Sequence, residues 1–432
     1  MTTARHIPDH RALLPAPVTG AGGAPPALDA VIVPSARCAA SIHESATVAR
    51  DAGAVLVVLC SKQSRSDQVR AVAGRHLPGE RVAAVDVPQG QVAGRRWLRT
   101  ERIDTGEPST RDTGAKRNLA IRLALSMGWR QVLFLDDDVT APRAHVIRAA
   151  SARLGARGGP GAVGWAFEEF PDNSLVCHAH RLAGGRQGTF VGAGGLLLRV
   201  DQRLPHFPGV YNEDWLFFAD LMVRRHRGLA FGGTLRQKAF DPFADPAHAR
   251  RQEFGDVLGE GLFALLHRRT PLSAATSSGY WADYLNVRSS FLADVEQRLL
   301  DSRAVPPARF PRARVPGSGE PRLADLSRLH RALEGVSVAR HTLAQHRRDW
   351  ELDLPAYVRA WRQDAVVWNR MLSRTTSAAT DLDDALGRLG LSRSSALPAH
   401  RELGGARMPR SIATVTARVR SSTSSLVNTL SR

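Results

Sequence analysis

Residues 131–138 read Gln131-Val132-Leu133-Phe134-Leu135-Asp136-Asp137-Asp138 and are the most informative segment of the chain. The apolar run has the length of a buried strand, and three acids follow it without a spacer. In an open parallel sheet, ligands bind outside the carboxyl ends of the strands, where loops and helix N-termini converge. The segment therefore predicts three carboxylates at the ligand-binding edge of a sheet.

The sequence before this segment repeats a strand and helix pattern. Short apolar runs at 30–34, 54–60 and 82–87 predict buried strands. Apolar residues at helical spacing predict helices near 68–74 and over 114–127. Four such steps predict an α/β fold with a Rossmann-like, mostly parallel sheet that has helices on both faces.

Composition divides the 432 residues into four regions. Residues 1–27 are rich in proline, glycine and alanine and predict a flexible N-terminal arm, whereas residues 28–279 hold the α/β pattern. Residues 280–391 predict an α-helical C-terminal region with a proline-rich linker at 305–321. Residues 392–432 form a basic tail rich in serine, threonine and arginine, and both a disordered tail and a basic amphipathic helix on anionic lipid are open for it.

The formal net charge of +18 raises the question of nucleic-acid binding. Lys62, Lys116 and Lys238 are the only lysines among the 59 basic residues, and the arginines are not concentrated in one arm. This distribution argues against nucleic acid as a partner, since an anionic small substrate needs only a few of these arginines.

The sequence also bears on the compartment of the protein. No apolar run is long enough for a transmembrane helix or a signal peptide, so we expect a cytoplasmic protein, with peripheral membrane contact through the tail left open. Cys38, Cys60 and Cys177 are odd in number and lie far apart. Buried free thiols therefore explain them better than disulfides or a zinc site.

The aspartate run suits a divalent cation. Carboxylate oxygens are the ligands that hard cations such as Mg²⁺ or Mn²⁺ prefer. A simpler interpretation is that one aspartate caps a helix expected over 139–150. Three successive carboxylates repel one another and need a cation or wide solvation, so the run favours a metal site.

A glycine-containing strand and an acid pair follow further along the chain. Residues 190–199 form an apolar run with three glycines, which are Gly192, Gly194 and Gly195. Glycines let a ligand approach the backbone closely. Glu213 and Asp214 then begin a helical stretch, where acids also interact with the helix dipole. Capping alone does not predict an acid pair at this place in the order of elements.

From about residue 28 to residue 266, this order of elements resembles the GT-A glycosyltransferases, especially those of the broad family 2 type. The resemblance rests on the opening strand with its proline, the Arg117-Asn118 helix, the aspartate triplet, the glycine strand and the acid pair. It implies a metal-dependent enzyme, with Mn²⁺ or Mg²⁺, that moves a sugar from a nucleotide-diphosphate-sugar donor to an acceptor hydroxyl. The acceptor and the choice between inversion and retention stay open.

The resemblance also implies roles for individual residues. In that family the opening strand and its loop contact the nucleotide, and the matching residues here are Pro34, Ser35 and Arg37. The Asp-X-Asp motif, which holds metal and ribose, matches Asp136 and Asp138 and leaves Asp137 as a bystander. The acid that deprotonates the acceptor in inverting members matches Asp214, an ordinary task for a general base.

The resemblance implies further roles for residues that match the family pattern less directly. Glu213 would orient the acceptor or the helix start, and Gly194 and Gly195 would let the donor approach the strand. Many members use a downstream histidine as a further metal ligand, for which His248 is the first candidate and His226 the second. A surface histidine without such a role is equally open.

Three basic residues surround the helix before the aspartates, namely Arg111, Lys116 and Arg117. They could clamp phosphates or form a solvated basic face. Three acids at helical spacing are Glu253, Asp256 and Glu260. They could form an acceptor-side face or the exposed side of a helix. The chain has no acid in the segment Leu59-Cys60-Ser61-Lys62, where family members often carry one to bind the base, so the donor nucleotide stays open.

Two other functions fit parts of this pattern. A sugar-phosphate nucleotidyltransferase would be expected to carry a glycine-rich phosphate loop after the first strand, but residues 33–37 contain no glycine. An inactive GT-A scaffold that binds polyanions through arginine has no reason to keep Asp136, Asp138 and Asp214. The acids therefore favour sugar transfer.

Overall fold

The structure is a computed structural model of the chain. It describes residues 9–14, 28–88, 98–103, 105, 112–140, 142–168, 174–186, 188–223, 228–304, 321–375, 377 and 379–392. These residues belong to one compact unit, Met1–Ser394.

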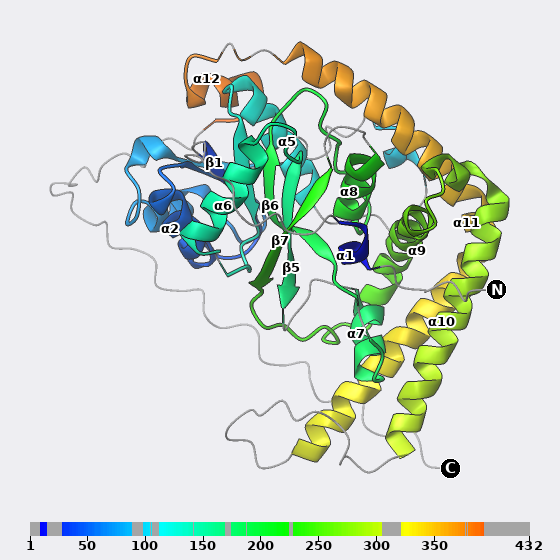
Figure 1. Cartoon of the computed structure of the whole chain (residues 1–432). Coiled ribbons are helices and arrows are strands. Elements are labelled where there is room, and N and C mark those ends of the chain that lie inside the picture. Colours follow the sequence, from blue (N-terminus) through cyan, green and yellow to red (C-terminus); the bar gives the residue numbers. More distant parts are fainter. Residues whose placement is uncertain are drawn as a thin grey trace, which may run out of the picture. The chain divides into compact units, whose positions relative to one another are not determined.

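A sheet of seven described strands forms the centre of this unit, in the order β3-β2-β1-β4-β6-β5-β7 (Figure 1). The strands are β1 (Ala30–Ser35), β2 (Val55–Cys60), β3 (Val82–Asp86), β4 (Gln131–Leu135), β5 (Ala162–Glu168), β6 (Val191–Arg199) and β7 (Leu229–Arg236). Strand β6 runs antiparallel to β4 and β5, and the other neighbours pair in parallel. The predicted mostly parallel sheet is therefore confirmed.

Helices cover both faces of the sheet, because each central strand is apolar on both sides. Ala30 and Ile32 of β1 join one core, and Val31 and Val33, which point the opposite way, join another. The second core contains α2 (His43–Asp51), α3 (Ser66–Ala73) and α6 (Ala144–Gly155). The first contains α5 (Thr113–Ser126), α7 (Leu175–Leu182), α8 (Glu213–Val223) and α9 (His248–His267). The predicted fold class is confirmed.

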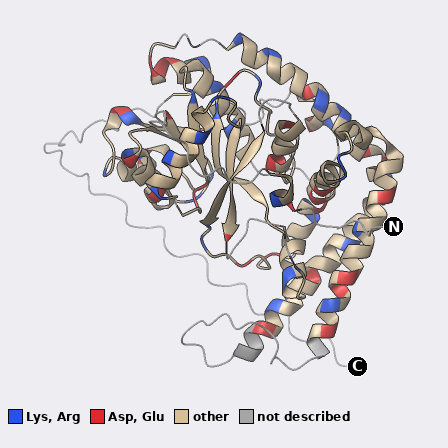
Figure 2. Cartoon of the chain, viewed as in Figure 1, with Lys and Arg blue, Asp and Glu red and all other residues tan. Residues whose placement is uncertain are grey.

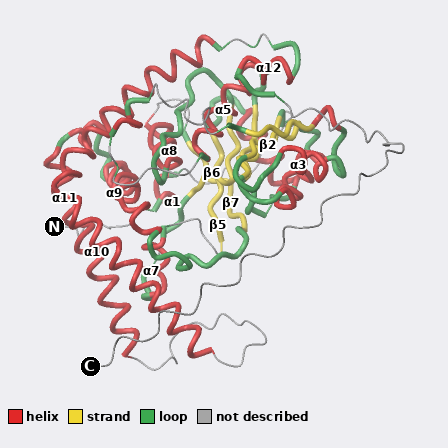
Figure 3. The backbone as a smooth tube through the Cα atoms, turned by 180° about the vertical axis from the view of Figure 1, so that it is seen from behind, coloured by secondary structure: helices red, strands yellow, loops and turns green. Residues whose placement is uncertain are grey.

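The C-terminal region is helical, as predicted (Figure 3). It consists of α10 (Ser278–Ala304), α11 (Pro321–Arg374) and α12 (Leu382–Arg388). Helix α11 packs on α10, α7 and α9. Its buried Asp364 accepts hydrogen bonds from the backbone N–H groups of Arg99 (2.7 Å) and Thr100 (3.0 Å), at the short helix η4 (Thr100–Arg102). Trp368 Nε1 donates to the Leu204 carbonyl at 2.9 Å. These contacts fix α11 to the α/β core.

Part of the predicted N-terminal arm is described. Helix α1 (His10–Leu13) places His10 in the core, stacked on Phe263 with 4.0 Å between ring centroids. His10 Nδ1 accepts a hydrogen bond from the backbone N–H of Val191 at 3.2 Å, which ties α1 to the start of β6. The other residues of the arm, most of the proline-rich linker and almost all of the basic tail lie outside the described residues.

The structure also shows where the charged side chains and the three cysteines lie. Figure 2 shows basic and acidic residues along the same described helices. None of the described helices is long and apolar enough to cross a membrane. All three cysteines are free, and Cys60 and Cys177 are buried as predicted, but Cys38 is exposed because it follows β1 in a surface loop.

Candidate active site

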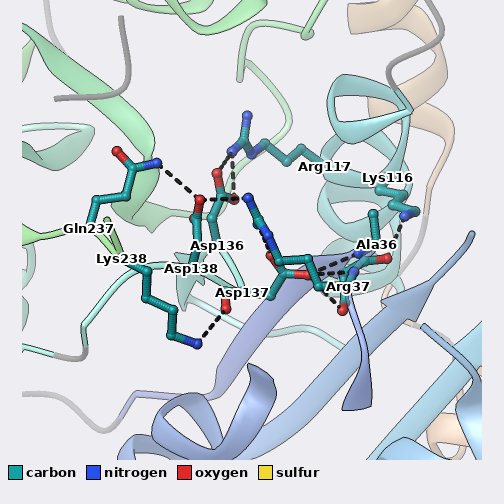
Figure 4. Close-up of polar contacts among 10 residues, drawn as sticks. Ala36, Arg37, Lys116, Arg117, Asp136, Asp137, Asp138, Gln237 and Lys238 are labelled. Atoms are coloured by element: carbon teal, nitrogen blue, oxygen red, sulfur yellow. Dashed lines mark hydrogen bonds and ion pairs between the residues drawn. The ribbon is translucent and has the colours of Figure 1, made fainter. Parts of the chain in front are cut away.

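The aspartate triplet follows β4 directly, and its three side chains point in different directions (Figure 4). Asp136 extends the strand, since its backbone N–H donates to the Gly194 carbonyl of β6 at 2.9 Å. Helix α6 begins only at Ala144, after Arg143 as its N-cap. The triplet is therefore no helix cap, and the simpler interpretation of these aspartates was wrong.

Asp137 holds the loop after β1. Its Oδ2 accepts hydrogen bonds from Ser35 Oγ (2.9 Å) and from the backbone N–H groups of Ala36 and Arg37 (both 3.0 Å). The Arg37 guanidinium pairs with its Oδ1. Burial alone would raise the pKa of Asp137, but these backbone donors and the guanidinium outweigh it, so the pKa lies below its ordinary value. Asp137 is thus no bystander, because it shapes the loop that was predicted to contact the nucleotide.

Asp138 lies between β1 and the end of β7. Its Oδ2 accepts from Arg37 Nη2 at 2.9 Å and from Gln237 Nε2 at 3.1 Å. The Lys238 N–H donates to the Asp138 carbonyl at 2.7 Å, and Lys238 Nζ lies 3.3 Å from the Asp137 carbonyl oxygen. The sequence reasoning missed Gln237 and Lys238. The only signal available was that Lys238 is one of three lysines in the chain.

Arg117 connects Asp136 at the end of β4 to Glu213 of the acid pair. Its side chain, 3% exposed, donates through Nη2 to both carboxylate oxygens of Asp136 (2.8 and 3.0 Å) and through Nη1 to Glu213 Oε1 (3.1 Å). Burial raises the pKa of Asp136, and the guanidinium beside it only partly offsets this. The predicted donor residue Arg117 therefore lies at the site, where it bridges two carboxylates.

Asp214 lies beside the glycines of β6. Its Oδ2 accepts from the Ala193 N–H at 3.0 Å, and its Oδ1 from the Trp215 N–H at 2.9 Å. A Cβ added to Gly192 would lie 3.7 Å from Asp214 Oδ2, and one added to Gly194 would lie 2.9 Å from Asp136 Oδ2. Residues two apart on a strand share a face and are about 7 Å apart. Asp214 and Asp136 therefore flank one glycine face of β6.

Gly195 lies on the opposite face of the same strand. A Cβ there would come 2.6 Å from Leu235 Cδ1 and 3.5 Å from Trp165 Cβ. Its missing side chain makes room for packing, so the structure does not bring Gly195 together with Gly194 at the acid face.

Lys116 holds the ends of β1 and β2 together. Its buried ammonium group donates to the Ser35 carbonyl (2.8 Å) and to Ser61 Oγ (2.6 Å), and it pairs with Asp112 at 3.0 Å. Burial lowers the pKa of Lys116, and Asp112 offsets part of that effect. Pro34, the neighbour of Ser35, is buried in β1 opposite Leu59 of β2. Lys116 thus stabilises the start of the predicted nucleotide loop through Ser35 and is not part of a solvated face.

The remaining candidates lie elsewhere. His248 begins α9, is 55% exposed and has its Nε2 3.3 Å from Asp245 Oδ2, so its role as a metal ligand stays a prediction. His226 and Arg111 lie outside the described residues. Within the described ranges, no group of three or more His, Cys, Asp or Glu side chains is arranged to hold a metal ion.

The acids of α9 form neither an acceptor-side face nor an exposed helix side. All three are buried around the guanidinium of Arg288 from α10, and they are Glu253, Asp256 and Glu260. Both interpretations of these acids were wrong, because a cation distant in the sequence compensates them inside the core.

Comparison with known proteins gives only distant similarities. No family model and no curated protein matches the chain. Among solved structures, it is similar to the mannosyltransferase PcManGT from Pyrobaculum calidifontis in complex with GDP-Man and Mn²⁺, with 16% identity, 82% of this chain and 92% of that chain covered, and a TM-score of 0.41. It is also similar to glucosyl-3-phosphoglycerate synthase from Mycobacterium tuberculosis (16% identity, 49% and 71% covered, TM-score 0.33). A third is mannosyl-3-phosphoglycerate synthase from Rubrobacter xylanophilus (14%, 56% and 76%, 0.35).

The site as a whole joins acids and bases from five elements at one edge of the sheet. Loops after β1, β4 and β7 and the N-terminal part of α5 supply most of them (Figure 4). Glu213 in the first turn of α8 joins them through Arg117. Such an edge can hold an anionic ligand through Arg37 and Lys238 while Asp136 and Asp214 approach it along β6.

Proposed function

We propose that the chain is a GT-A type glycosyltransferase that moves a sugar from a nucleotide-diphosphate donor to an acceptor hydroxyl, with Mn²⁺ or Mg²⁺. The observation that carries this proposal is the common glycine face of β6, with Asp136 beside Gly194 and Asp214 beside Gly192. The two glycine positions are about 7 Å apart along the strand. The Phe167 ring also contacts this face, 2.8 Å from the Cβ position at Gly192 and 3.0 Å from that at Gly194.

The donor side of this proposal rests on Asp138 and its neighbours. Mg²⁺ is commonly held by one or two carboxylates together with substrate phosphates, so a complete protein cage is not needed. The Asp138 side chain is 12% exposed, and its partner Arg37 is 55% exposed, so a cation can take the place of the guanidinium at that oxygen. When bound, the metal would neutralise the leaving diphosphate. Lys238 adds a compact positive charge beside the Asp137 carbonyl.

The acceptor side rests on Asp214. Two backbone N–H groups hold its carboxylate against β6, one from Ala193 on the strand and one from Trp215 in its own helix. A carboxylate fixed in this way can take the proton of an acceptor hydroxyl that approaches the sugar, which is the task of a general base. Glu213 is tied to Arg117 and therefore orients the helix start.

The test separates donor binding from transfer. Nucleotide diphosphates of uridine, guanosine and thymidine are offered with and without Mn²⁺, and the melting temperature is followed, because a ligand that binds the folded state stabilises it. Asp138→Ala should abolish the metal-dependent shift. Asp214→Asn should keep the shift and lose sugar transfer from the matching donor. Asp283→Asn, on the exposed side of α10, is the control that should change neither.

Two results would count against the proposal. If Asp138→Ala keeps the full Mn²⁺-dependent shift in melting temperature, the cation does not bind at Asp138. If Asp214→Asn transfers sugar at the rate of the unaltered chain, Asp214 is not the general base.

A further inference from the structure

The turn before the acid pair has an unusual backbone conformation. Asn212, which directly precedes α8, has φ +62° and is one of only three non-glycine residues with positive φ in the described part of the chain. Asparagine tolerates this left-handed region better than most side chains. The Asn212 carbonyl accepts the Trp215 N–H at 3.0 Å, so this turn sets the first hydrogen bond of the helix that carries Asp214.

Helix α9 holds this turn from behind. Asn212 Nδ2 donates to Asp256 Oδ1 at 3.0 Å and lies 3.5 Å from the Gly255 carbonyl oxygen. A Cβ on Gly255 would come 2.2 Å from the Tyr211 carbonyl oxygen, so the turn lies directly on the α9 backbone. This close approach leaves the Asn212 amide facing a buried carboxylate.

Asp256 is itself fixed from the C-terminal helical region. Arg288 of α10 donates through Nη2 to Asp256 Oδ2 at 3.1 Å and also bonds to Glu253 and Glu260, with its own side chain fully buried. A chain of contacts thus runs from Arg288 through Asp256 and Asn212 to the first turn of α8.

We propose that Asn212 and Asp256 are positioning residues that fix the Glu213–Asp214 helix start, and that α10 takes part in this through Arg288. The inference rests on the proposed function for the role of Asp214. Removal of either positioning residue would let the first turn of α8 open and move the Asp214 carboxylate relative to Gly192. The donor side, which is built on Asp138, would be unaffected.

A structural measurement tests this without any activity. Hydrogen exchange is followed at the Trp215 and Leu216 amides, which both donate to the Asn212 carbonyl (3.0 and 3.4 Å). The Trp215 amide also donates to Asp214 Oδ1 at 2.9 Å, so the Leu216 amide is the more direct reporter of the turn. Asn212→Gly permits the left-handed backbone but lacks the amide donor, and it should speed exchange about tenfold or more, as should Asp256→Ala. Asp256→Asn keeps one acceptor oxygen for the Asn212 amide but places its NH₂ group against Arg288, so its exchange should lie between those of Asp256→Ala and the unaltered chain. Glu260→Gln alters the same buried cluster and serves as the matched control.

Sugar transfer gives the second readout. In Asn212→Gly and Asp256→Ala, kcat should fall about tenfold or more while the donor KM stays within about twofold, because misplacing a catalytic group by about 1 Å can cost that much. Unchanged exchange at both amides in these two variants would overturn the inference. If the unaltered chain transfers no sugar from any donor, the proposed function fails, and the exchange result still decides whether Asn212 and Asp256 position the turn.

Discussion

Glu260 offers a test of how the buried acids of α9 are charged. Its Oε2 lies 2.9 Å from Arg288 Nη1, and it shares that one guanidinium with Glu253 and Asp256. Burial raises the pKa of Glu260 to about 8, and the two neighbouring acids add to this while Arg288 opposes it. Tyr284 also faces Glu260 and has its own pKa raised, first by burial. This raised pKa favours the protonated form of Glu260 in the folded protein at neutral pH.

The sign of the pH dependence follows from this proton. The ordinary value for Glu260 is 4.5, so between 4.5 and about 8 the folded state holds a proton that the unfolded chain releases. The stabilisation from this group is complete below pH 4.5 and is lost as the pH rises to 8. At about 1.4 kcal/mol per pH unit, the total loss is on the order of 5 kcal/mol.

Urea unfolding at pH 5, 6, 7 and 8, followed by tryptophan fluorescence, measures this loss for the unaltered chain and for Glu260→Gln. Glutamine has nearly the shape of a protonated glutamate, so at pH 5 the two free energies of unfolding should agree within about 1 kcal/mol. At pH 8 the variant should be the more stable by about 3 kcal/mol or more. Glu351→Gln, on α11, controls for the exchange itself. A difference between Glu260→Gln and the unaltered chain that stays constant from pH 5 to 8 would refute the protonated state.

Three further changes probe other contacts. Asp137→Ala removes the acceptor of Ser35 and of two backbone N–H groups, so urea unfolding should give a free energy lower by about 2–4 kcal/mol. Asp364→Asn keeps one acceptor oxygen and loses the other, and it should lower the free energy of unfolding by about 1–2 kcal/mol; an unchanged melting temperature would contradict the link between α11 and η4. Burial lowers the pKa of His10 from 6.5 to about 3, so its contribution is present above pH 6.5 and is lost on acidification towards pH 3; His10→Phe should flatten the acid limb of the stability curve.

The first half of the sheet was predictable because its signals are local. The runs that became β1 to β4 are apolar on both sides, as strands buried on both faces must be, and helical spacing identified α3 and α5. Strands β5 and β7 were missed. β7 contains Gly232 and Gly233, which weaken the strand pattern, and a Cβ on Gly232 would come 2.7 Å from Trp165 Cε2 of β5. Gly232 is explained only by the packing of two strands distant in the sequence, and Gly233 by its positive φ of 106°.

In the site too, some features follow from local sequence patterns and others depend on long-range contacts. The order of elements predicted that Asp136 and Asp214 belong to one site, and the structure places both beside the glycine face of β6, while their roles stay predictions. The role of Asp137 was not, because its hydrogen bonds reach a loop about 100 residues earlier. Gln237, just after β7, reaches the site because it forms an isolated bridge with Val139. No local sequence pattern encodes that pairing. Long-range pairing therefore decides the details that spacing cannot.

The buried acids of α9 make the core of residues 28–279 depend on the C-terminal helical region. Their spacing predicts one helix face but leaves its environment open, and only Arg288, 28 to 35 residues later, makes burial possible. Breaking a buried pair by removing one partner costs about 3–5 kcal/mol. A chain that ends at residue 279 would leave Glu253, Asp256 and Glu260 in the core without their cation. We therefore expect residues 28–279 alone to be insoluble, whereas co-expression with residues 280–391 should recover folded protein; a soluble, cooperatively melting fragment 28–279 would contradict a core that depends on α10.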